Sequence, residues 1–149
     1  MKMFSKFSLL FLFLAAVVGA ASADTPGRHP AYLHALSDLR DARAHLARIG
    51  PNDHIDNEEQ RAIDEIDAAI HEIKRAAIDD GKDIRDYTPI DAHLDRRGRF
   101  HRALELLDKA HHDIDKEEDD PYTRGLQHRA LHHIDEAQHT VEHIVHSSE

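Results

Sequence analysis

Histidine is the residue type that could give this chain chemistry, because the sequence contains 15 of them. Five lie near the C-terminus at spacings that repeat along one face of a helix, and they are His128, His132, His139, His143 and His146. Two imidazoles four residues apart on a helix are neighbours, and neutral imidazole binds zinc, copper and nickel. We name these five residues the histidine row and take it as a candidate metal site.

A helix over residues 120–146 would turn the histidine row away from the protein interior. At ~100° per residue, its apolar residues from Leu126 to Ile144 fall within an arc of about 100°, and the histidine row falls within about 60° on the opposite side. His132 and His139 are ~10.5 Å apart along the axis, too far to share one metal ion. Since a structural zinc usually needs four ligands, we expect weak two-histidine sites that water or a partner chain completes.

Other histidines suggest less specific sites. His111 falls among Leu104, Leu107 and Ile114 on an expected core face, which makes it a candidate core ligand or a buried histidine satisfied by one hydrogen bond. Two patterns combine histidines with acids on one flank of a helix: His34, Asp38, Asp41 and His45 form one, and His101, Glu105, Asp108 and His112 form the other. Such acids favour protonated imidazole or orient it for a metal, but chance also produces these spacings here.

The elements that position these residues are predicted to be helices. Apolar residues recur every three to four positions, which predicts an all-α protein with helices at about 30–49, 56–80, 91–118 and 120–146. Asp56 and Glu59 have the spacing of a capping box, and Asp91 can cap the third helix. Short connections favour an antiparallel up-down-up-down four-helix bundle, a single domain over residues 24–149.

A faint internal repeat accompanies this pattern. Residues 63–65 and 134–136 share the sequence Ile-Asp-Glu, and Leu39, Ala42 and Leu46 align with Phe100, Ala103 and Leu107. Two related helical hairpins would explain the repeat, although any two amphipathic helices can align this well.

The first 23 residues have the pattern of a signal peptide. Lys2 and Lys6 precede an apolar run over residues 7–18. This run is too short to span a bilayer. Ala21 and Ala23 are the small residues that a signal peptidase reads, so we expect cleavage before Asp24. We expect an exported protein, periplasmic or extracellular, with no stable membrane insertion after cleavage; an uncleaved anchor is the alternative.

Composition narrows the classes of function. With 29 acidic and 19 basic residues and a net charge of −10, nucleic acid is not an expected partner. The absence of cysteine excludes disulfides, thiolate metal sites and a cysteine nucleophile. A di-iron site is also excluded, because the one Glu-x-x-His pair, Glu136 and His139, lies on the expected solvent side. We therefore expect no enzyme activity.

The amino-acid sequences of three segments resemble those of a known protein family. HPAYLHALSDLR (29–40), IKRAAIDDG (73–81) and EEDDPYTRGL (117–126) resemble a family of small exported bacterial helical proteins. The resemblance covers nearly all of the expected mature chain. That family has no assigned activity, so the resemblance implies an exported bacterial setting and no site residues.

The sequence is consistent with two functions. The first is weak binding or buffering of copper, zinc or nickel ions by surface histidines. The second is a non-enzymatic structural or interaction role in the cell envelope, with an envelope protein as partner and a histidine-rich surface that responds to pH. The arginines at positions 96, 97, 99 and 102 could bind an anion, but pairing with the protein's own acids is the plainer interpretation.

Overall fold

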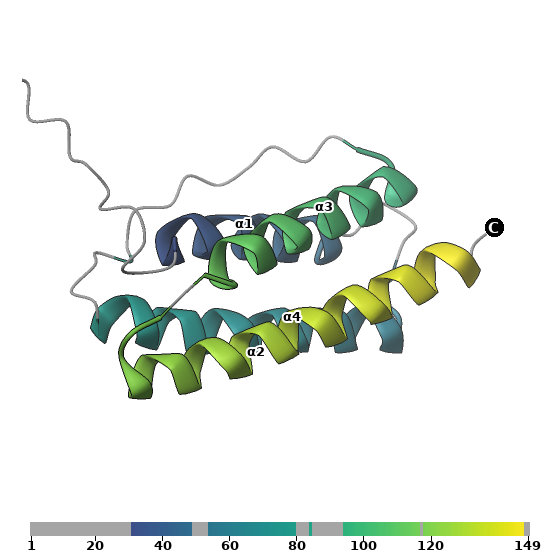
Figure 1. The fold of residues 1–149 in the computed structure, drawn as a ribbon. Helices are drawn as coiled ribbons and strands as arrows, with labels where there is room; N and C mark the ends of the chain where they lie inside the picture. Colours follow the sequence, from purple (N-terminus) through teal and green to yellow (C-terminus); the bar gives the residue numbers. More distant parts are fainter. Residues whose placement is uncertain (1–30, 49–53, 80–83, 85–93, 117, 148–149) are drawn as a thin grey trace, which may run out of the picture.

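The computed structural model describes residues 31–48, 54–79, 84, 94–116 and 118–147. Within them the chain forms α1 (Tyr32–Leu46), α2 (Asn57–Asp79), α3 (Arg96–Ile114) and α4 (Pro121–Ser147), packed as a helical bundle (Figure 1). The predicted all-α class is confirmed. In the part of the chain that the structure describes, no helix combines the length and apolar character needed to cross a bilayer. The predicted signal peptide, residues 1–23, lies outside the described residues.

The arrangement of the helices differs from the predicted one. α1 and α4 each pack against both α2 and α3, so α1 and α4 lie on one diagonal of the bundle. α1 and α3 are antiparallel: the Tyr32 hydroxyl at the start of α1 donates to Glu118, just beyond α3, over 2.7 Å, and Lys109 pairs with Asp38. α2 and α3 begin at the same end of the bundle, where Arg96 pairs with Glu59 over 2.9 Å, so they run in the same direction, as Figure 1 shows.

The up-down-up-down order is thus wrong, and the observed order is up-down-down-up. The prediction assumed short connections throughout, but 16 residues separate Asp79 from Arg96. A chain of that length can reach ~50 Å, whereas the 23 residues of α2 span only ~35 Å. The chain is therefore long enough to return to the end of the bundle where α2 began before it starts α3.

All four helices contribute to one apolar core. The predicted stripes of α2 and α4 are confirmed, because their isoleucines, leucine, valine and alanines are buried. The core face of α3 is rotated from the predicted one: Leu106 is 2% exposed, whereas Leu104 is only partly buried. α1 and α3 are in extensive contact, and each helix has fully buried alanines, among them Ala35 and Ala42 of α1 and Ala103 and Ala110 of α3.

Capping residues explain where the helices begin. At the start of α2, the Glu59 amide donates to Asp56 over 2.9 Å and the Asp56 amide donates to Glu59 over 2.8 Å, so the predicted capping box is confirmed. α3 begins at Arg96 rather than near residue 91, because Asp95 is its cap and accepts from the Gly98 amide over 2.7 Å. α3 ends at Ile114 rather than near residue 118.

Candidate functional site

The histidine row lies along the solvent face of α4. All five side chains are exposed, while residues such as Leu126, Ile134 and Val141 on the opposite face are buried. The outward orientation predicted from the helical wheel is therefore confirmed. A continuous helix holds the imidazole pairs, so each pair lies on neighbouring turns and is open to ions in solution.

The row offers pairs of ligands rather than an assembled centre. Among the described residues, no group of three histidine, aspartate or glutamate side chains is arranged to hold a metal ion. Each pair supplies two imidazole nitrogens, and any further ligand must come from water, a side-chain movement or another molecule.

The pair His139 and His143 lies beside an acid of a second helix. Both residues line a groove of about 190 Å³ together with Glu58 and Arg61 of α2. His143 Nδ1 is 3.3 Å from a Glu58 carboxylate oxygen, although the His143 side chain stays 63% exposed. Glu58 adds an oxygen that could coordinate or orient a cation, whereas the guanidinium of Arg61 repels one.

The pair His128 and His132 lies toward the other end of α4. His128 lines an open cleft of about 400 Å³ that also includes Asp115 and Glu118, near the end of α3. The ring of His132 lies 5.9 Å from the ring of His133, centroid to centroid. At this end of the row His128 thus lies near two acids, but Lys116 and Arg124 line the same cleft and repel a cation.

His111 does not occupy the predicted core position. Its side chain is 33% exposed, and its Nε2 atom lies 3.3 Å from the Asp135 carboxylate on α4. The rotation that brings Leu106 into the core instead of Leu104 moves His111 to the α3–α4 seam. Its role as a candidate core ligand therefore has no support from its position.

Three histidine–carboxylate pairs join α4 to its neighbours. His111 meets Asp135 of α4, His133 Nδ1 lies 2.7 Å from Glu65 of α2, and His143 lies beside Glu58. Each is an ion pair only when its imidazole carries a proton. Protonation thus changes the charge at both seams of α4.

His45 is the histidine whose importance the sequence did not reveal. It is 4% exposed, and its Nδ1 atom is buried with no hydrogen-bond partner among the described residues. Burial lowers the pKa of His45; the charges of Arg102, Arg99 and Arg48 lower it further, and Asp41 opposes them. The burial of His45 could have been predicted from its position on the helix. It lies three residues after Ala42 and six after Leu39, so it continues the buried stripe of α1.

One acid of each mixed pattern forms an ion pair with a basic residue instead of pairing with a histidine. Asp38, which is 8% exposed, accepts from Lys109 of α3 over 2.9 Å. Glu105 accepts from Arg102 over 2.7 Å. These patterns therefore help to join α1 and α3 and to stabilise α3, and the structure does not group their histidines into a site.

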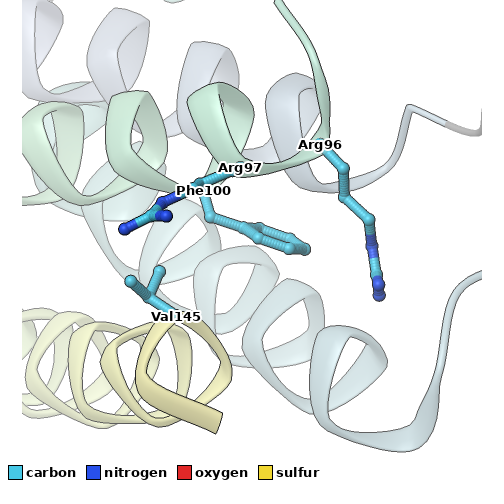
Figure 2. A pocket seen from close by; sticks show the side chains of 4 residues that line it. All are labelled: Arg96, Arg97, Phe100 and Val145. Carbon is cyan, nitrogen blue, oxygen red and sulfur yellow. The ribbon is translucent and has the colours of Figure 1, made fainter. Parts of the chain in front are cut away.

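A cleft of about 200 Å³ opens beside the start of α3 (Figure 2). Figure 2 shows the Phe100 ring between Arg96 and Arg97, with Val145 of α4 across the opening. The Arg96 guanidinium pairs with the buried carboxylate of Glu59 over 2.9 Å and lies over the Phe100 ring. Pairing with the protein's own acids, the plainer interpretation of the arginine cluster, thus holds for Arg96.

Comparison with family models, with curated proteins and with solved structures finds no match to this chain.

Proposed function

We propose that this protein is exported and binds divalent transition-metal ions weakly through the histidine row. The observation that carries the proposal is the presence of two exposed imidazole pairs, His128/His132 and His139/His143, each on adjacent turns of one well-packed helix. Imidazole nitrogen suits copper, zinc and nickel, and the acidic chain attracts cations in general. The function is buffering or carrying such ions without catalysis.

The proposed sites are weak because each chain supplies two nitrogen ligands per ion. A closed structural zinc site usually holds four protein ligands. The Glu58 oxygen near His143 can contribute to one site, but Arg61 in the same groove reduces the gain. We therefore expect micromolar or weaker binding by a single chain.

Calorimetric titration with Cu²⁺, Zn²⁺ and Ni²⁺ at pH 7 tests this function. The variants His128→Gln/His132→Gln and His139→Gln/His143→Gln should each weaken binding by at least about tenfold at the altered pair, because one imidazole pair is lost. The matched control His71→Gln/His112→Gln removes two exposed histidines that have no histidine four residues away, and it should bind as the wild type does. Absence of saturable heat from the wild type at a protein concentration well above micromolar, or an equal loss in the control, would contradict the proposal.

A second candidate function is a structural or interaction role in the cell envelope that responds to pH. The three histidine–carboxylate pairs at the seams of α4 favour it, because their charge state changes with imidazole protonation. Helicity and self-association measured from pH 7.5 to pH 5 test this role. If neither quantity changes over that range, the proposed response to pH is wrong.

We also infer that the hairpins α1–α2 and α3–α4 are related by duplication. The repeat aligns Glu58 with Arg129 and Glu72 with His143. The structure contains both cross-pairs of these positions, Glu72–Arg129 at 3.0 Å and Glu58–His143 at 3.3 Å. Such an exchange is expected when two similar hairpins pack about an approximate two-fold axis.

A further inference from the structure

The spacing of the first four members of the histidine row is the same in both directions. The successive intervals, from His128 to His132, on to His139 and on to His143, are four, seven and four residues. If a second copy of α4 lies antiparallel to the first, His128 comes opposite His143 of the partner subunit, and His132 comes opposite His139 of the partner subunit. One register therefore aligns both pairs at once.

We propose that a second copy of this chain completes the metal sites of the histidine row. Two α4 helices pack antiparallel about a two-fold axis, and each of two zinc ions is held by four imidazoles. One site consists of His128 and His132 of one chain with His139 and His143 of the partner subunit, and the axis generates the other. This inference rests on the proposed function, since it requires that the histidine row bind metal.

The ligand count supports a dimer. Zinc prefers four tetrahedral ligands, and imidazole is one of its usual ligands. Within the described part of one chain, no third ligand joins either pair in a geometry that holds a metal. A second copy supplies the two missing nitrogens for each ion, and a two-fold interface uses the same surface on both chains.

Helix geometry supports the same arrangement. His128 and His139, like His132 and His143, are 11 residues apart, which is close to three turns of an α-helix. The two pairs therefore face the same direction to within about 20°, and the two zinc sites would lie ~16 Å apart along α4. All four side chains are exposed, although His139 and His143 also border Glu58 and Arg61 of α2.

Charge keeps the chains apart until metal is present. Asp135 and Glu136 lie midway between the two histidine pairs and are exposed, so their copies would approach one another at the axis. The net charge of −10 on each chain adds to this repulsion. We therefore expect a monomer without metal and a dimer with zinc.

Sedimentation equilibrium of the purified protein with zinc alone tests the dimer. The mass should double at one zinc ion per chain and return to that of a monomer when a chelator is added. Neither His128→Gln/His132→Gln nor His139→Gln/His143→Gln should dimerise alone, but an equimolar mixture of the two variants should form a heterodimer. That heterodimer retains one complete four-histidine site. His71→Gln, which alters an exposed histidine of α2 outside the histidine row, is the control and should dimerise as the wild type does.

The outcomes separate this inference from the proposed function. If calorimetry shows bound zinc while the protein stays monomeric, the dimer is wrong and metal binding by the single chain stands. If zinc does not bind at all, both proposals are wrong. If either double variant dimerises with zinc by itself, the antiparallel pairing of different histidine pairs is wrong.

Discussion

Replacing Leu106 with alanine is expected to lower the free energy of unfolding by about 2–5 kcal/mol, because the change leaves a cavity in the core. Leu106 is 2% exposed on the face of α3 that packs in the bundle. Leu104→Ala is the matched control, since Leu104 is only partly buried against the same core. The Leu104→Ala substitution should cost under about 2 kcal/mol, because Leu104 buries less apolar surface than Leu106 does.

Urea unfolding followed by circular dichroism measures both variants. The helical wheel alone predicts the opposite order, because it places Leu104 in the core stripe. A larger loss for Leu104→Ala than for Leu106→Ala would mean that α3 is rotated toward the arrangement predicted from sequence. His111 would then face the interior, and its role as a core ligand would have to be considered again.

Replacing His45 with leucine is expected to stabilise the fold and to reduce its sensitivity to acid. The His45 side chain is 4% exposed and its Nδ1 atom is unsatisfied, so an apolar replacement removes a polar desolvation penalty of about 1–3 kcal/mol. His71→Leu, which replaces an exposed histidine of α2, is the control and should change stability by less than about 0.5 kcal/mol.

The direction of the pH dependence follows from the lowered pKa of His45. Burial and the facing charges of Arg102 and Arg99 disfavour imidazolium in the folded state, so the unfolded chain binds this proton first as the pH falls. Above about pH 7.5 His45 is neutral in both states, and its titration does not lower the stability of the fold. The stability then decreases as the pH falls through the ordinary value of about 6.5 toward the lower folded-state pKa.

Urea unfolding of wild type and His45→Leu between pH 7.5 and pH 5 measures this contribution. The difference in unfolding free energy between the two proteins should grow as the pH falls, because only the wild type carries the buried imidazole. Parallel curves over the whole range would contradict the claim that His45 destabilises the fold in acid. Comparing the two proteins cancels the effects of the other histidines, which both retain.

The features that depend on a single helix could be predicted from the sequence. The apolar stripes of α2 and α4 are regular, so they predict both the buried residues and the outward histidine row. The reciprocal bonds between Asp56 and Glu59 also depend only on local spacing. Such features follow from periodicity and capping chemistry, which act over a few residues.

The features that depend on packing between helices could not be predicted from the sequence. On α3, Leu104 and Leu106 are both consistent with an amphipathic helix, and packing in the bundle buries Leu106 while it leaves Leu104 only partly buried. The direction of α3 relative to α2 depends on the path of the 16 residues after Asp79, and local periodicity does not determine this path. The charges of Arg102 and Arg99 that help to lower the pKa of His45 come from α3, so this lowered pKa does not follow from α1 alone.

Nuclear magnetic resonance of the imidazole rings during zinc titration tests the central claim most directly, because it reports which histidines bind. We expect the ring signals of His128, His132, His139 and His143 to shift together and to saturate. Signals of the exposed histidines at positions 34, 71 and 112 should stay unchanged. Equal shifts at all exposed histidines, or no shift in the row, would contradict the claim that the outward face of α4 is a metal site.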